Sequence, residues 1–185
     1  GEAYLSKGDF YKAVACLSKA LELRINRPIN SMISKAYFNL GDVYYKKGEF
    51  DKAIDNYSRA IEIMPNDAAA YTNRGVIYEQ KSDLDKAIDD HNKAIEIKPD
   101  YAMAYYNRGN SYFYKGDLDR AIADFSEAME IDPDYIGAYN NRANTYLSKK
   151  EYDKAWGDVH KIESLGARAN PALLDELKKA SGREA

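Results

Sequence analysis

The sequence predicts an all-α fold in which antiparallel pairs of helices stack into a solenoid. The first observation is a strict internal period, since Ala36, Ala70, Ala104 and Ala138 each open a similar segment 34 residues after the one before. The second is that each repeat holds two segments with apolar and small residues at helical spacing. A period of this length indicates a helix-turn-helix unit too small to bury its own apolar face, so neighbouring units must stack.

Composition limits the classes of protein to which the chain can belong. Its 185 residues are 45% hydrophobic, which is enough for a substantial core. The net charge is only −3 and no basic run is present, so we expect no nucleic-acid partner. No window approaches the ~20 apolar residues of a transmembrane helix, so we expect no membrane insertion. The one cysteine, Cys16, cannot form an internal disulfide and indicates no compartment.

Residues 1–33 are expected to hold the end of one further repeat and an insertion. Gly8 precedes its counterpart Gly48 by 40 residues, six more than the period. The extra chain lies around Pro28, which is expected to end or interrupt a helix. Gly1 falls at the eighth position of a repeat, so we expect the native N-terminus to lie upstream.

The same end of the array is expected to be prone to association. Its apolar face, formed by Ala13, Leu17 and Ala20, lacks the front of its partner helix. Exposed apolar faces at the ends of solenoids promote association, so a homo-oligomer through the N-terminal end is possible.

Four full repeats follow, and positions are counted from the first residue of each. The repeats are expected at 34–67, 68–101, 102–135 and 136–169. Gly48 and Gly116 suit the left-handed turn that ends the first helix. Prolines at position 32 stop the second helix of the first three repeats. From Asn170 the repeat gives way to an expected capping helix and tail, 170–185, in which Asn170 caps the helix and Leu173, Leu174 and Leu177 form an apolar stripe.

The motif itself resembles that of a known family. Its fixed positions are the fourth (Tyr37, Tyr71, Tyr105, Tyr139), eighth (Gly41, Gly75, Gly109, Ala143), eleventh (Tyr44, Tyr78, Tyr112, Tyr146), twentieth (Ala53, Ala87, Ala121, Ala155) and thirty-second (Pro65, Pro99, Pro133). The pattern resembles the tetratricopeptide repeat family over roughly nine tenths of the chain. The resemblance implies a right-handed superhelix whose inner groove binds other proteins, with no catalysis of its own.

Neither catalytic nor metal-binding residues are evident. His91 takes the position that Tyr57, Phe125 and Val159 fill in the other repeats, and it is predicted to lie in the core. His160 takes a polar outer position, and no further ligand stands at metal-site spacing. We therefore expect no enzyme activity, no metal and no cofactor. The eight tyrosines at positions four and eleven are predicted to pack between the helices.

The candidate binding surface is the face of each first helix opposite the packed stripe. Of its 24 residues four are charged, against 17 of 24 on the exposed face of the second helices. Amides and aromatic side chains suit the binding of a peptide. The predicted peptide-binding residues are Asn39, Asn73, Asn107, Asn141, Asn110, Asn144, Phe38, Tyr45, Tyr106, Phe113 and Tyr114. Alternatively, some of the aromatic residues pack against neighbouring repeats.

Within the family this face lines the groove, and several members hold an extended peptide with an Asn ladder at the equivalent of Asn39, Asn73, Asn107 and Asn141. A second family mode, the carboxylate clamp, needs Lys at position five of one repeat and Lys or Arg at positions two and six of another. Phe38, Thr72, Tyr106 and Asn140 stand fifth here, and Asn stands sixth throughout, which argues against a clamp.

The leading hypothesis is thus a non-enzymatic module that binds a protein or peptide segment. The alternatives are a self-assembling scaffold subunit and a regulatory fragment of a larger protein.

One pair of positions varies together without being part of the packing motif. In each of the last three repeats an Arg stands at position seven and an Asp at position 23. The pairs are Arg74 with Asp90, Arg108 with Asp124, and Arg142 with Asp158. The first full repeat has Leu40 and Asn56 instead. We predict three Arg–Asp pairs that fix helix packing.

Overall fold

A computed structural model describes residues 12, 15 and 27–182 of the chain. Among these residues it contains nine α-helices and no strand, grouped into two compact units that meet in sequence at Ile97 and Lys98. None of the described helices has the length and apolar character needed to cross a membrane. Apart from two residues, the expected partial repeat lies outside the described part, as do Gly1, Leu17 and Ala20.

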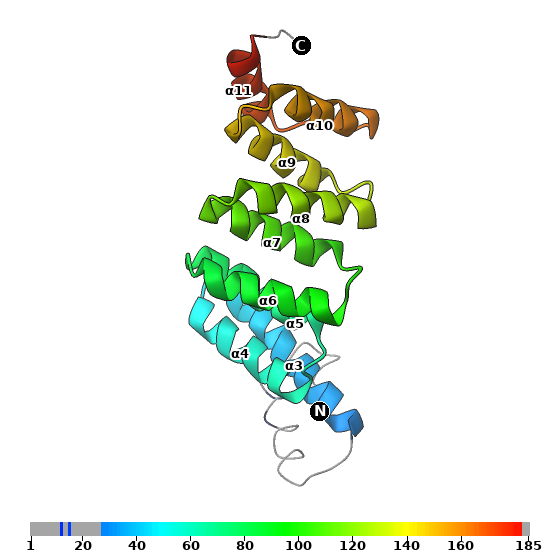
Figure 1. Ribbon diagram of the computed structural model, residues 1–185. Helices are drawn as coiled ribbons and strands as arrows, with labels where there is room; N and C mark the ends of the chain where they lie inside the picture. Colours follow the sequence, from blue (N-terminus) through cyan, green and yellow to red (C-terminus); the bar gives the residue numbers. More distant parts are fainter. Residues whose placement is uncertain (1–11, 13–14, 16–26, 183–185) are drawn as a thin grey trace. The chain divides into compact units, whose positions relative to one another are not determined.

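The first unit contains two antiparallel helix pairs (Figure 1). They are α3 (Arg27–Lys46) with α4 (Phe50–Ile63), and α5 (Ala68–Gln80) with α6 (Leu84–Ile97). Each helix packs on the next one along the chain. Asp67 begins α5 by accepting hydrogen bonds from the backbone nitrogens of Ala69 and Ala70.

The prediction that Pro28 ends a helix concerns residues before Arg27, which lie outside the described part; the structure shows instead that a helix begins at this proline. Pro28 lies in the first turn of α3, where a residue without an amide hydrogen is tolerated because no acceptor precedes it. As a result α3 has 20 residues, whereas α5 has 13. Part of the extra chain is therefore helical.

The second unit contains two further pairs and a final helix. The pairs are α7 (Ala102–Lys115) with α8 (Leu118–Ile131), and α9 (Ile136–Ser148) with α10 (Tyr152–Ser164); the last helix is α11 (Pro171–Ser181). Asn170 caps α11 as predicted, by accepting a hydrogen bond from Ala172 N at 2.9 Å. Leu173 and Leu177 are buried where α11 packs on α9 and α10.

The turn between the helices of a repeat adopts a left-handed conformation in all four repeats. Gly48 and Gly116 have φ of 74° and 83°, as their residue type predicts. Ser82 and Lys150 stand at the same place with φ of 62° and 61°. Side chains rarely adopt this conformation, so the fold imposes it on these two residues.

The centre of each full repeat except the last is a ring packed on a glycine. The ring stands at position 24 and the glycine at position eight. Tyr57, His91 and Phe125 are at most 1% exposed. A Cβ added to Gly41, Gly75 or Gly109 would lie within 2.7 Å of the facing ring. The glycines therefore allow the two helices of a repeat to approach closely.

The prediction that the tyrosines at positions four and eleven form the core holds only in part. Tyr37, Tyr112 and Tyr139 are buried, whereas the other five are half-buried. Several of these rings flank an arginine. The Arg74 guanidinium lies 5.6 Å from the Tyr71 ring centre and 5.9 Å from that of Tyr78.

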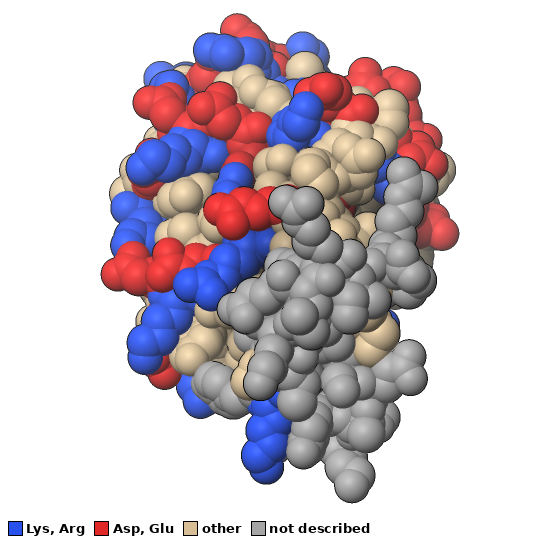
Figure 2. All heavy atoms as spheres, turned by 90° about the horizontal axis from the view of Figure 1, so that it is seen from below, with Lys and Arg blue, Asp and Glu red and all other residues tan. Residues whose placement is uncertain are grey.

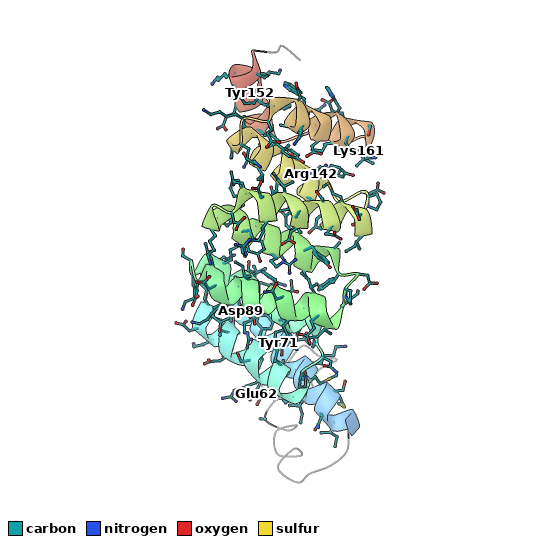
Figure 3. All side chains as sticks on the ribbon, in the orientation of Figure 1. Glu62, Tyr71, Asp89, Arg142, Tyr152 and Lys161 are labelled. Atoms are coloured by element: carbon teal, nitrogen blue, oxygen red, sulfur yellow. The ribbon has the colours of Figure 1, made fainter. Side chains whose placement is uncertain are left out.

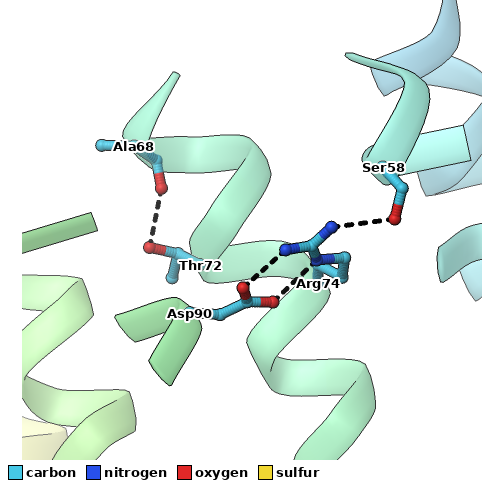
Figure 4. Close-up of polar contacts among 5 residues, drawn as sticks. All are labelled: Ser58, Ala68, Thr72, Arg74 and Asp90. Carbon is cyan, nitrogen blue, oxygen red and sulfur yellow. Dashed lines mark hydrogen bonds and ion pairs between the residues drawn. The ribbon is translucent and has the colours of Figure 1, made fainter. Parts of the chain in front are cut away.

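The predicted Arg–Asp pairs are confirmed, and all three join the two helices of one repeat. Arg74 donates from Nε and Nη2 to the Asp90 carboxylate at 2.8 and 2.7 Å (Figure 4). Arg108 makes the same two bonds to Asp124, both at 2.7 Å. In the last repeat Arg142 binds Asp158 at 3.0 and 2.6 Å. Two parallel hydrogen bonds fix the orientation of both side chains.

These Arg–Asp pairs are largely buried, and two of the arginines also donate a hydrogen bond to a serine of the preceding repeat. Burial raises the pKa of the Asp90 carboxyl above its ordinary value, and the Arg74 guanidinium counters this effect. Arg74 Nη1 also donates to Ser58 Oγ of the preceding repeat at 2.8 Å. Arg142 lies among α8, α9 and α10 (Figure 3) and likewise donates to Ser126 Oγ at 2.7 Å. One guanidinium therefore links three helices.

Candidate functional site

A pocket of about 300 Å³ opens on the first-helix face of the first unit. It is lined by residues of α3, α4 and α5: Asp42, Tyr45, Lys46, Tyr57, Asn73 and Val76. Two of them, Tyr45 and Asn73, are predicted peptide-binding residues. The pocket thus lies where the low charge and the amides of the sequence indicate a binding surface.

Asp42 forms the polar centre of this pocket. The Tyr57 hydroxyl donates to Asp42 Oδ1, and Asn73 Nδ2 lies 3.4 Å from the same oxygen and 3.4 Å from the hydroxyl. Burial, with a smaller effect from Asp42, holds the pKa of Tyr57 well above its ordinary range. Tyr57 is therefore a neutral hydrogen-bond donor at neutral pH.

The remaining predicted residues of the first unit are partly engaged in packing. The Phe38 ring is half-buried and meets the Tyr57 ring edge-on, with centroids 5.5 Å apart. Tyr45 packs 6.1 Å from Phe50, and its hydroxyl accepts a hydrogen bond from Gln80 Nε2 at 2.8 Å. Asn39 is half-buried. Phe38 therefore belongs as much to the core as to the surface.

In the second unit one predicted amide joins two repeats. Asn141 Nδ2 on α9 donates to Asn110 Oδ1 of α7 at 2.7 Å and to the Tyr106 hydroxyl at 3.0 Å. Tyr106 in turn packs 4.9 Å from the Tyr135 ring and 5.9 Å from the Phe125 ring. Asn107 is half-buried. Asn141, Asn110 and Tyr106 thus form a polar contact between α7 and α9.

The exposed large hydrophobic residues of this face lie in the second unit. Tyr114 is 65% exposed and Met103 is 45% exposed. Phe113 is half-buried, with its ring 5.9 Å from that of Tyr114. Asn144 is exposed beside a recess of about 260 Å³ between α9 and α11. Aromatic and amide groups are therefore available for contact with a ligand.

The outer faces of the second helices differ from the first-helix face in that they are rich in charged side chains. Glu62 on α4, Asp89 on α6 and Lys161 on α10 are exposed (Figure 3). Exposed pairs of opposite charge are common there, as between Lys93 and Glu96 at 2.8 Å. On the face drawn in Figure 2, basic and acidic side chains are interspersed, so neither sign forms a continuous field. Such a surface favours solvation.

Neither histidine lies in a constellation typical of catalysis or metal binding. His91 is 0% exposed and its ring packs on Gly75, as predicted for a core residue. His160 is exposed, with its ring 5.9 Å from that of Trp156. Among the described residues, no three His, Cys, Asp or Glu side chains are grouped so that they could hold a metal ion.

Tyr57 and Asp42 are not among the peptide-binding residues that the sequence predicts. Tyr57 stands at position 24, which the helical pattern assigns to the core, yet its hydroxyl reaches the opposite face. A tyrosine where Phe125 and Val159 stand was the available signal, because a buried hydroxyl needs a hydrogen-bond partner.

Family models match much of the chain. The model described as TPR repeat matches residues 41–82, and models described as Tetratricopeptide repeat match residues 1–24, 68–101, 102–135 and 125–157. A search of curated proteins finds no match.

Solved structures of similar fold cover both units. The crystal structure of MamA is 26% identical, covers 99% of this chain and 97% of its own, and gives a TM-score of 0.71. The first TPR of Spaghetti (RPAP3), bound to the HSP90 peptide SRMEEVD, is 27% identical over 64% of this chain and 94% of its own, with a TM-score of 0.62. YrrB, at 24% identity, covers 96% of this chain and 88% of its own, with a TM-score of 0.73, and supports the fold alone. The chain is an all-α helical repeat protein that belongs to the tetratricopeptide repeat family.

Proposed function

We propose that this chain is a non-enzymatic module that binds an extended protein segment along the first-helix face of its repeats. The observation that carries the proposal is the contrast between the two faces. Tyr114, Met103 and the Asn144 amide are exposed on the first-helix face of the second unit, and the first-helix face of the first unit carries the Asp42 pocket. Accessible aromatic side chains beside amides are typical of peptide-binding surfaces.

Each unit presents its own stretch of this face. In the first unit α3 and α5 supply Asn39, Tyr45 and Asn73, and in the second unit α7 and α9 supply Asn107, Asn110, Phe113, Tyr114 and Asn144. The RPAP3 relative binds a peptide, which supports a ligand of the same chemical class. Amides that bond to the ligand's main chain would give affinity with little demand on its sequence.

The ligand is not expected to be an acidic C-terminus such as SRMEEVD. A clamp for its carboxylates needs Lys at position five of one repeat and Lys or Arg at positions two and six of another. This chain has Phe38, Thr72, Tyr106 and Asn140 at position five, and Thr72 is fully buried. We expect no measurable binding of SRMEEVD by calorimetry.

A display selection tests the proposal without knowledge of the partner. A random library of about 12 residues is selected on the full chain, and the affinities of the recovered peptides are measured for variants. Tyr114→Ala and Asn144→Ala should weaken binding about three- to tenfold, the effect of losing one contact or hydrogen bond. Lys161→Ala, on the outer face, should leave the affinity unchanged.

Two outcomes would contradict the proposal. One is the recovery of no binding peptide. The other is peptides whose affinity falls for Lys161→Ala but not for Tyr114→Ala. A chain that binds no peptide but associates with itself as its concentration rises, measured by light scattering, would favour the scaffold alternative.

A further inference from the structure

Asp42 differs from the buried aspartates of the three following repeats. Asp90, Asp124 and Asp158 are each bound by an arginine through two hydrogen bonds. Those arginines lie against tyrosine rings, as Arg108 does at 5.4 Å from Tyr105 and 6.0 Å from Tyr112. In this protein a guanidinium that is bound by a carboxylate and lies against tyrosine rings thus recurs in three repeats.

The Asp42 pocket repeats this setting without the cation. Its walls carry the Tyr45 and Tyr57 rings and Val76, and its two hydrogen-bond donors, the Tyr57 hydroxyl and the Asn73 amide, are both neutral. Both donate to Oδ1, so Oδ2 receives no hydrogen bond from the described residues. Lys46 also lines the pocket, but it is exposed and forms no ion pair with Asp42 within the described part of the chain.

We infer that the Asp42 pocket binds the side chain of an arginine in the peptide ligand, with the guanidinium at Asp42 Oδ2 and the aliphatic stem against Tyr45 and Val76. This inference rests on the proposed function, whose ligand it makes specific. A planar guanidinium can donate to a carboxylate while it stacks on an aromatic ring, so arginine should be preferred over lysine.

The pocket also implies that a basic side chain is preferred at only one position of the bound peptide. Position nine holds Asp42 in the first full repeat but Val76, Asn110 and Asn144 in the next three. Position nine of the later repeats therefore offers no carboxylate. We expect one arginine at a fixed register in the bound segment, and no general preference for basic peptides.

The display selection described above tests this inference separately from the proposed function. Peptides selected on the full chain should share an arginine at one position. Selection on Asp42→Asn should yield binding peptides without it, whereas selection on Asp89→Asn, the same charge change on the outer face of α6, should retain it. Binding peptides without an enriched basic position would overturn the inference and leave the proposed function standing. Recovery of no peptide at all would overturn both.

A second measurement needs no change to the protein. In one selected peptide the arginine is replaced by citrulline, which keeps the shape and removes the charge. The affinity for the unaltered chain should fall about tenfold or more, the usual effect of losing a hydrogen bond between charged groups. The affinity for Asp42→Asn should not change, and Lys46→Ala should strengthen binding because it removes a competing positive charge. An equal affinity of both peptides for the unaltered chain would overturn the inference.

Discussion

An aromatic ring at position 24 requires a glycine at position eight. In the fourth repeat, position 24 holds no ring and position eight holds no glycine. There Val159 stands at position 24 and Ala143 at position eight, and both are fully buried. Valine is smaller than the tyrosine, histidine or phenylalanine of the other repeats, so it leaves room for a methyl group on the facing helix. The two positions are therefore matched in volume.

We expect Gly109→Ala to destabilise the chain by about 1 to 3 kcal/mol, as overpacking does in other cores. The added Cβ would lie 2.7 Å from Phe125 Cε1, and Phe125 is fully buried. In the double variant with Phe125→Val, the alanine should cost at least about 1 kcal/mol less, because the pair then matches that of the fourth repeat. Urea unfolding of the four proteins of the cycle measures both quantities.

Gly157→Ala is the matched control for this cycle. Gly157 lies in α10, and a Cβ there would meet nothing within 4 Å. Alanine should stabilise the helix by about 0.5 to 1 kcal/mol. Independent, additive effects of Gly109→Ala and Phe125→Val would show that the two positions are not coupled.

The amides of the first-helix face should separate into two kinds. Asn141→Ala removes two hydrogen bonds between α9 and α7, so we expect a loss of about 1 to 2 kcal/mol of stability. Asn144→Ala, at an exposed position, should change stability by less than about 0.5 kcal/mol. Thermal unfolding distinguishes the two, and equal destabilisation would mean that Asn144 also has a structural role.

At the scale of the helix pair, two turns carry strain that two others avoid. We expect Ser82→Gly to stabilise the chain by about 1 kcal/mol, because φ of 62° is unfavourable for a side chain and ordinary for glycine. Lys150→Gly should act in the same way. Denaturant midpoints measure the change.

The reverse substitution provides the control. Gly116→Ser places a side chain at φ of 83°, where a Cβ would have open space around it. Any loss of stability must then come from the backbone conformation. A gain from Ser82→Gly without a loss from Gly116→Ser would point to a different cause for the gain.

Sequence periodicity predicts the helices well, but it does not predict every place where the structure departs from the repeat pattern. The four repeats, their turns and the Arg–Asp pairs follow from the 34-residue register, because equivalent residues meet equivalent neighbours. The start of α3 at Pro28 could not be predicted, since a proline either ends a helix or begins one and the pattern around it is irregular. The left-handed turns at Ser82 and Lys150 were not evident, because the fold overrides residue preference there.

The candidate surface could be predicted as a face but not as a set of contacts. Position five illustrates the limit, since Thr72 there is fully buried while Phe38 is half-buried against Tyr57. A helical wheel gives the direction in which a side chain leaves its helix. It does not give the position of the neighbouring helix, which decides whether that side chain is covered. The pocket around Asp42 was missed for the same reason, because it combines residues of three helices.

At the scale of the molecule, α11 protects the end of the second unit. Leu177 is fully buried and Trp156 Nε1 donates to Ser181 Oγ at 3.1 Å. Leu177→Asp should therefore detach α11 and lower stability by roughly 3 kcal/mol or more, with increased binding of a hydrophobic dye. Leu174→Asp, at a half-buried position of the same helix, should cost clearly less. Similar effects of both changes would mean that α11 does not cover the core as described.

The arginines that link three helices have a consequence for the order in which the chain opens. Arg74 holds α5 to α6 through Asp90 and to α4 through Ser58, so α5 cannot leave without breaking both attachments. The pair α3 and α4 has Leu40 and Asn56 at the equivalent positions, so it has no Arg–Asp pair there. Its amides should therefore exchange hydrogen faster than those of α5 and α6. Among the described helices, loss of structure would then begin in α3 and α4 and stop before α5, because Arg74 holds that helix in place on both sides.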